Sequence, residues 1–218
     1  METQNYIIND LKPFDSNDTL SQVKNAFSQL TFSHIPVSED GIFIGCISET
    51  DAQCFEGTKT LKEYRYAIEP FFVTINTNWL DILEAFAQRA TNIMPVLGEE
   101  GTYLGYYELS DIMDLFNHTP FLNETGGIIE VEKGSHDYSF SEICQIVESN
   151  DGKVLGAFIS KIENDITQTT IKIGHTGMNA IAQTFRRYGY TVVSEHEEDK
   201  MADELKERSD YLNKYLNI

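Results

Sequence analysis

The chain has 218 residues, enough for one large domain or two modest ones with their own cores. Its hydrophobic content of 41% and charged content of 23% are those of a globular protein and exclude extended disorder. The formal net charge of −19 repels polyanions, so we exclude nucleic acid and anionic membranes as main partners. No apolar run approaches a membrane span of ~18 residues, and the first residues lack the features of a signal peptide. We therefore expect a cytoplasmic protein.

The first half of the chain contains an internal repeat. Residues 17–37 align with residues 76–96 at a shift of 59 positions, and the matched residues include an apolar helix-like pattern and a Pro-Val pair. After one inserted residue, GCISETD at 45–51 aligns with GYYELSD at 105–111. A match of this length predicts two copies of one structural unit.

In the first copy, a short apolar strand is expected at 6–8 and a helix that opens near Thr19. The apolar face of this helix is spaced by three and four residues and consists of Leu20, Val23, Phe27 and Leu30. The predicted strand at 34–37 contains Ile35, which precedes Pro36 and is therefore biased to extended conformations. A turn at 38–41, a strand at 42–47 and a helix at 48–55 complete the copy.

The second copy predicts the same order of strand, helix, strand, strand and helix. Its strands are expected at 71–73, 93–97 and 103–107, with a turn at 98–101 and a closing helix at 109–116. The helical face between the first two strands consists of Trp79, Ile82, Leu83 and Phe86. Because a unit this small buries its own sheet poorly, we expect the two copies to pack face to face.

The repeated turn of the first copy has the residue types of an anion site. Gly45 permits close approach of a ligand or of another backbone segment. Ser48 lies at the start of a predicted helix, where free N–H groups favour phosphate, and its hydroxyl donates to oxygen. Asp51, one turn further, accepts hydrogen bonds from a ribose diol. The local pattern alone is equally consistent with a helix cap and a first-turn carboxylate.

The second copy differs at the position of the serine. Glu108 places a carboxylate where a phosphate would lie and opposes an anion by ~1 kcal/mol or more. Asp111 is retained and has the residue type that holds a ribose. This cleft is therefore expected to be empty, to accept a ligand with a neutral or cationic tail, or to hold phosphate through a metal.

Each copy resembles a cystathionine-β-synthase (CBS) domain in its Pro-Val strand, its acidic Gly-containing turn and its Gly-x-x-Ser-x-x-Asp step. The resemblance covers residues 1–118, with one repeat at about 5–68 and the other at about 69–118. It implies two clefts that bind AMP, ADP, ATP or S-adenosylmethionine as a regulatory ligand. The ligand-binding positions that it implies are Ile35, Pro36, Gly45, Ser48, Asp51, Ile93, Pro95, Glu108 and Asp111.

Residues 117–127 have the composition of a linker. Beyond it, strands are expected at 128–133, 153–162, 166–173 and 190–194, and helices at 139–149 and 178–188. This βαββαβ order is the ferredoxin-like plan, so the predicted fold class is α/β (α+β). Residues 127–196 resemble an ACT domain, a regulatory fold that often binds amino acids. Phe140 stands where the family's ligand loop has glycine, which favours a structural or dimerising role.

The final residues, 197–218, predict an amphipathic C-terminal helix. A CBS pair followed by an ACT-like domain resembles the acetoin-utilisation accessory protein family of bacteria.

No enzymatic constellation emerges from the remaining residues. The five histidines lack HxH or HExxH spacing, so no metal site is expected, and the three cysteines have the setting of small buried hydrophobes. We therefore predict a non-enzymatic module that senses an adenosine-type ligand and modulates an unidentified partner protein. The alternative is a dimeric scaffold with vestigial clefts. In both cases a homodimer is expected, because both resembled families bury faces against a second copy.

Overall fold

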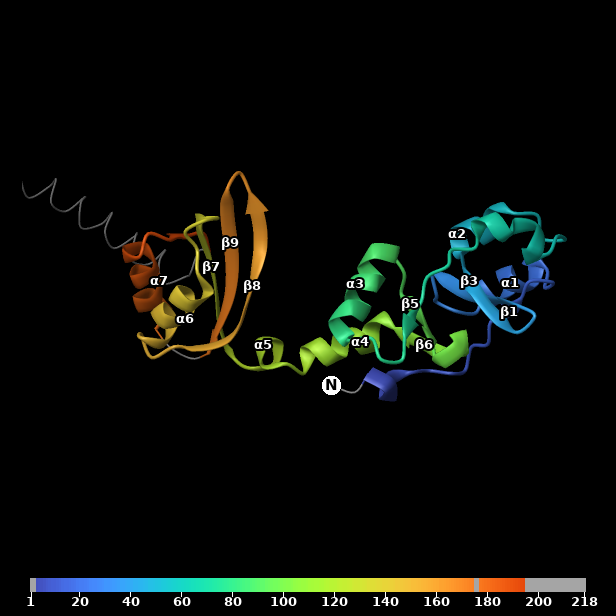
Figure 1. The fold of residues 1–218 in the computed structure, drawn as a ribbon, viewed down its shortest axis with the longest axis horizontal. Helices are drawn as coiled ribbons and strands as arrows, with labels where there is room; N and C mark the ends of the chain where they lie inside the picture. Colours follow the sequence, from blue (N-terminus) through green and yellow to red (C-terminus); the bar gives the residue numbers. More distant parts are fainter. Residues whose placement is uncertain (1–2, 175–176, 195–218) are drawn as a thin grey trace, which may run out of the picture. The chain divides into compact units, whose positions relative to one another are not determined.

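The computed structural model describes residues 3–174 and 177–194 of the chain. The chain divides into two compact units, residues 1–117 and residues 118–218, and each is described by itself (Figure 1). Among the described residues, no helix is long and apolar enough to cross a membrane. The predicted C-terminal helix at 197–218 and the end of the predicted 127–196 domain lie outside the described residues.

The first unit consists of two repeats of the predicted element order. The first repeat comprises β1 (Phe14–Asp15), α1 (Leu20–Phe27), β2 (His34–Glu39), β3 (Ile42–Ser48) and α2 (Glu49–Cys54). The second comprises β4 (Val73–Thr74), α3 (Trp79–Arg89), β5 (Ile93–Leu97), β6 (Tyr103–Glu108) and α4 (Leu109–Asn117). Each repeat has a three-stranded sheet, ordered β1-β2-β3 or β4-β5-β6, with the first pair parallel and the second antiparallel.

The helix faces predicted from apolar spacing form the cores of the repeats. In α1, Leu20, Val23 and Phe27 are buried, whereas Leu30 lies beyond the end of the helix, because α1 stops at Phe27. In α3, the buried residues are Ile82 and Phe86, with Trp79 and Leu83 packed at the edge of the same core. Thr19 precedes α1, and its N–H donates to the Gln22 side chain at 2.7 Å, which helps to fix the start of the helix.

Two short segments cross between the repeats. Ile8 follows the 3-10 helix η1 (Thr3–Tyr6) and exchanges two main-chain hydrogen bonds of 2.9 Å with Tyr106 in the second repeat. Glu69 follows the 3-10 helix η2 (Leu61–Ala67) and exchanges two of 2.8 Å with Cys46 in the first repeat. The expected strand at 6–8 is therefore wrong, because this segment completes the other repeat's sheet and the first repeat's own parallel strand is β1.

The crossing segments explain the repeated glycine. Gly45 and Gly105 have φ angles of +143° and +148°, which disfavour a side chain. A Cβ at Gly45 would lie 2.5 Å from the carbonyl oxygen of Glu69, and one at Gly105 would clash with the carbonyl of Ile8. The close approach predicted at this glycine is an approach of main chain to main chain in both repeats.

Equivalent residues of the two repeats also meet one another. The N–H of Ser33 donates to the Asn92 side chain at 2.8 Å, and the N–H of Asn92 donates to the Ser33 hydroxyl at 3.1 Å. Phe43 and Tyr103 stack with ring centroids 6.0 Å apart. These reciprocal contacts relate the repeats by an approximate two-fold axis, in agreement with the expected face-to-face packing.

The second unit has the predicted ferredoxin-like plan. Its elements are β7 (Gly126–Gly134), α6 (Phe140–Glu148), β8 (Lys153–Glu163), β9 (Ile166–Gly174), α7 (Met178–Arg187) and β10 (Thr191–Val192). The sheet is antiparallel in the order β10-β7-β9-β8, and α6 and α7 cover one face (Figure 1). The predicted linker at 117–127 contains a further short helix, α5 (Pro120–Asn123), in which Phe121 packs against Phe158 of β8.

Candidate nucleotide-binding clefts

Ser48 and Asp51 lie together where β3 ends and α2 begins. The Ser48 hydroxyl accepts a hydrogen bond from the Asp51 N–H at 3.0 Å and donates to the Asp51 carboxylate at 2.8 Å. Both residues are partly buried, so their polar atoms remain reachable from solvent. The helix cap with which the local pattern was equally consistent is therefore formed. A ligand at Ser48 would compete with Asp51 for the hydrogen bond that the hydroxyl donates. Because α2 has only six residues, the contribution of its dipole to anion binding is small.

His34 connects this pair to the second repeat. It is the register partner of Ser48 in the β2–β3 ladder and is only 7% exposed. Its ring lies edge-on to that of Phe71, with centroids 5.4 Å apart. Burial lowers the pKa of His34, against the opposing effect of the nearby Glu69 and Asp51 carboxylates. The imidazole is therefore held neutral beside Asp51.

Phe71 opens on a cavity of about 200 Å³ between the crossing segment and α3. The cavity is lined by Pro70, Phe71, Phe72, Ala85, Gln88, Arg89 and Met94. The Arg89 guanidinium lies over the Phe71 ring at 5.9 Å from its centroid. Arg89 is a positive charge beside Phe71 that sequence reasoning did not identify. In the sequence, the one feature that could have indicated Arg89 is its position in the last turn of a helix, four residues before Ile93.

The four predicted backbone positions lie in the central strands. Ile35 and Pro36 pair with Ile47 and Cys46, and all four of these residues are buried. Ile93 and Pro95 occupy the corresponding places in β5, opposite Glu108 and Tyr106. Their side chains therefore belong to the core.

The position of the expected second cleft is acidic. The Tyr106 hydroxyl donates to Asp10 at 2.7 Å. The pKa of Tyr106 is raised by burial and also by the carboxylates of Asp10, Glu108 and Asp111. Glu108, the last residue of β6, accepts a hydrogen bond of 3.3 Å from the Ser110 hydroxyl. Three carboxylates thus act on one hydroxyl, and sequence reasoning had identified two of them. Asp10 was missed because it reaches this cleft through the crossing segment.

In the second unit, side chains of the protein itself occupy the space beside the start of α6. Lys133 donates to Glu142 at 2.7 Å and lies 4.2 Å from the centroid of the Tyr190 ring. The Tyr190 hydroxyl accepts a hydrogen bond from the Ser139 N–H at 3.3 Å. Burial and the Glu142 carboxylate raise the pKa of Tyr190 to about 12, while Lys133 lowers that of Glu142. The position of the expected ligand loop is therefore occupied by a satisfied side-chain cluster.

The cysteines differ from expectation in two cases, since Cys144 is only partly buried and Cys54 is exposed. Cys46 is buried, and burial raises the pKa of its thiol, whereas Cys54 is exposed because it ends the short helix α2. Within residues 3–174 and 177–194, no group of three His, Cys, Asp or Glu side chains is arranged to hold a metal ion.

Comparison with known proteins found one matching family model and a set of similar solved structures. The CBS domain family model matches residues 62–118. A CBS domain pair/ACT domain protein from Thermotoga maritima is 19% identical over 53% of this chain and 96% of that chain, with a TM-score of 0.48. The CBS domains of a transcriptional regulator from Streptococcus pneumoniae are 17% identical over 52% of this chain and 98% of theirs, with a TM-score of 0.47. CBSX2 in complex with AMP is 14% identical over 53% and 95%, with a TM-score of 0.45. No curated protein matches the chain.

The matched residues correspond to the second repeat, which is therefore a CBS domain. The first repeat has the same elements, the same register and the same constrained glycine, so the first unit is a CBS domain pair. Among the matched structures, the CBS domain of a bacterial CNNM/CorC family Mg²⁺ transporter and the cytosolic domain of the Mg²⁺ channel MgtE are each in complex with ATP.

Proposed function

We propose that the protein is a non-enzymatic, cytoplasmic regulatory module that binds an adenine nucleotide or related adenosyl ligand and modulates a partner protein. Its ligand is AMP, ADP, ATP or S-adenosylmethionine, held in the cleft that begins at Ser48 and Asp51. The order of a CBS pair and a ferredoxin-like, ACT-like unit also supports a place in the acetoin-utilisation accessory protein family of bacteria.

The observation that carries this proposal is the placement of Ser48 and Asp51 beside elements of the other repeat. Asp51 acts on His34, whose ring contacts Phe71, and Phe71 lies beneath Arg89. These pairwise contacts connect the first repeat to the second. In this proposal Asp51 accepts hydrogen bonds from a ribose diol, and Arg89 is the positive charge at the other end of the series. This combination suits a nucleoside with a small negative charge.

The two clefts are predicted to differ in occupancy. The first has a hydroxyl at the start of α2, whereas the second has Asp10, Glu108 and Asp111 around Tyr106. Anionic ligands are repelled by the second set, since like charges at close range disfavour the charged form. We expect one nucleotide per chain, in the first cleft.

The first test is thermal unfolding with AMP, ADP, ATP and S-adenosylmethionine, each with and without Mg²⁺. A ligand at about 100 times its Kd adds about 2.7 kcal/mol, which corresponds to a rise of roughly 5–10 °C in midpoint. The double variant Ser48→Ala, Asp51→Ala should lose at least about tenfold in affinity, because hydrogen bonds to charged groups contribute about 1.5–3 kcal/mol. Asp111→Ala is the matched control in the second cleft and should retain binding. Wild-type affinity in the double variant would assign the ligand to another site.

The scaffold alternative is favoured by one observation in the second unit. β8 is an edge strand with exposed Phe158 and Ile162. If β8 pairs antiparallel with β8 of a second copy about Phe158, Lys153 lies opposite Glu163 at both ends. An edge strand leaves a row of main-chain N–H and C=O groups that can pair with another chain.

A charge exchange tests this arrangement. In Lys153→Glu, two opposed pairs become repulsive, and since exposed pairs are worth about 0.2–1 kcal/mol each, the dimer should weaken by roughly 2- to 30-fold. The double variant Lys153→Glu, Glu163→Lys should restore association, as measured by sedimentation velocity. Association that is unchanged in the single variant, or not rescued in the double variant, would place the dimer contact elsewhere. In wild type, Glu163 pairs with Lys161 of its own chain, so Lys161→Gln is the control.

A further inference from the structure

The contact between the two repeats contains a hydroxyl group that has more neighbouring acceptors than protons. The Ser33 hydroxyl lies 2.9 Å from Nδ1 of His34, 3.0 Å from Oδ1 of Asn92 and 3.2 Å from the Thr91 hydroxyl. His34 belongs to the first repeat, whereas Thr91 and Asn92 belong to the second. A serine hydroxyl donates only one hydrogen bond. The acceptor that receives its proton therefore depends on whether Nδ1 of His34 already carries one.

The main chain of Ser33 is held in place on both sides. Its N–H donates to the Asn92 side chain at 2.8 Å, and its carbonyl accepts from the Glu49 N–H, at the start of α2, at 2.9 Å. The hydroxyl oxygen itself accepts from the N–H of Asn92 at 3.1 Å. Because these hydrogen bonds fix the residue, a change of acceptor requires only rotation of the O–H bond.

In neutral His34 the surrounding charges favour a proton on Nε2. Nδ1 is occupied by Ser33, so Nε2 is the nitrogen left for the carboxylates of Asp51 and Glu69, which act on this ring. The nearest positive charge on α3, that of Arg89, lies over the Phe71 ring, which His34 contacts by its edge. With its proton on Nε2, the imidazole offers a bare Nδ1, and the Ser33 hydroxyl donates to it.

Protonation of His34 reverses this hydrogen bond. Nδ1–H then donates to the Ser33 oxygen, whose two lone pairs are filled by Nδ1–H and by the N–H of Asn92. The Ser33 proton is left with acceptors of the second repeat alone. Thr91 donates its own proton to the Ile93 carbonyl at 2.8 Å and is the more distant of the two, so the proton turns to Oδ1 of Asn92.

We propose that Ser33 is a proton-controlled switch at the contact between the repeats: its hydroxyl donates to His34 when the imidazole is neutral and to Asn92 of the other repeat when the imidazole is charged. Acidification thus adds one hydrogen bond between the repeats without moving a heavy atom. The switch exists on one side only, because Asn92, the equivalent of Ser33, is followed by Ile93. This inference goes beyond the proposed nucleotide function and does not depend on it.

The first test is nitrogen NMR of the full chain, isotope-labelled at its histidines and titrated from about pH 8 to about pH 5, the range in which a histidine changes charge. At the upper end, His34 should show a bare, hydrogen-bonded Nδ1 and a protonated Nε2. Nδ1 should gain its proton as the pH falls. A protonated Nδ1 in the neutral form, or a His34 that stays neutral throughout, overturns the proposal.

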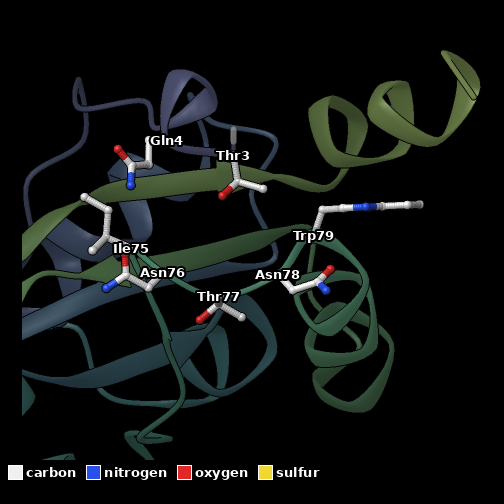
Figure 2. Close-up of a pocket in the computed structure, with 7 residues that line it drawn as sticks. All are labelled: Thr3, Gln4, Ile75, Asn76, Thr77, Asn78 and Trp79. Carbon is white, nitrogen blue, oxygen red and sulfur yellow. The ribbon is translucent and has the colours of Figure 1, made fainter. Parts of the chain in front are cut away.

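The second test measures the hydrogen bond between the repeats by a double-mutant cycle of Ser33→Ala and Asn92→Ala in urea unfolding. The fluorescence of Trp79, the only tryptophan of the chain, reports unfolding. Trp79 borders a groove of about 460 Å³ whose described lining residues are all uncharged (Figure 2), so its signal does not follow the titration of a lining residue. Below the His34 midpoint, the coupling of the two substitutions in the unfolding equilibrium constant should be about two- to tenfold larger than above it, the range of one net hydrogen bond.

Two histidine variants are the controls. His34→Ile, with the residue type of the equivalent position in the second repeat, should give the same coupling at both pH values. His136→Gln, at an exposed histidine, should keep the difference of the wild type. Coupling that does not change with pH in the wild type, or that still changes in His34→Ile, overturns the proposal.

Discussion

One residue, the last of the second antiparallel strand, distinguishes the two repeats most clearly. Ser48 and Glu108 occupy equivalent ends of β3 and β6, yet Ser48 caps the following helix through Asp51 while Glu108 adds to the acidic set around Tyr106. A hydroxyl donates to phosphate, and a carboxylate repels it. The same position of the fold therefore favours a phosphate in one repeat and repels it in the other.

His34 makes the free energy of unfolding depend on pH. Because burial lowers the pKa of His34 in the folded protein, the unfolded chain takes up a proton near the ordinary value of 6.5 while the folded protein does not. The free energy of unfolding should therefore fall as the pH drops through 6.5 towards the lowered value. Urea unfolding between about pH 7.5 and 5.5 measures this.

The natural control for His34 is in the second repeat, where Ile93 occupies the same position. His34→Ile should flatten the pH dependence in that window, whereas His136→Gln, at an exposed histidine, should not. A pH dependence that is as steep in His34→Ile as in wild type would assign the proton uptake to another group.

At the scale of elements, each repeat depends on a crossing segment that pairs with its sheet. Ile8→Pro removes the N–H that donates to Tyr106, and Glu69→Pro removes the N–H that donates to Cys46. Each lost hydrogen bond costs about 0.5–1.5 kcal/mol, with a further penalty where the carbonyl stays buried. Hydrogen exchange should accelerate in β6 for Ile8→Pro and in β3 for Glu69→Pro. Loss of protection in the mutated residue's own repeat alone would contradict the exchange of segments.

These segments also mark the limit of prediction from sequence. Spacing of apolar residues predicted the helices and strands of both units, because each element follows one period. The repeated glycine at 45 and 105 predicted a close approach but not its partner. Pairing between segments that are far apart in the chain leaves no local signal. For that reason Tyr6-Ile7-Ile8 was expected in the wrong sheet, and Asp10 was missed in the second cleft.

The candidate site follows the same division. Ser48, Asp51, Glu108 and Asp111 were found because they recur in a short pattern. His34, Phe71 and Arg89 come together only through packing of one repeat on the other, so the pattern of neither repeat contains them.

At the scale of the whole molecule, the hydrophobic cores determine which fragments of the chain can fold by themselves. One cluster lies entirely within residues 118–218, whereas Cys46 of the first repeat belongs to the cluster built on α3, β5 and β6. A fragment of residues 1–117 should therefore unfold cooperatively, as followed by circular dichroism. A fragment of residues 1–68 should not, because it lacks the crossing residue Glu69 and exposes the apolar face shared with the second repeat. A folded 1–68 fragment would show that the repeats are independent.

The exchange of crossing segments has a consequence for how such a chain arose. A single copy of the repeat has no segment to complete its own sheet, but two identical copies complete each other by reciprocal exchange, as a symmetric swapped dimer does. Duplication and fusion convert that encounter into an intramolecular one at high effective concentration. Once the halves are joined, identity between them is no longer required, and each binding position is free to diverge. Serine in one half and glutamate in the other are such a divergence.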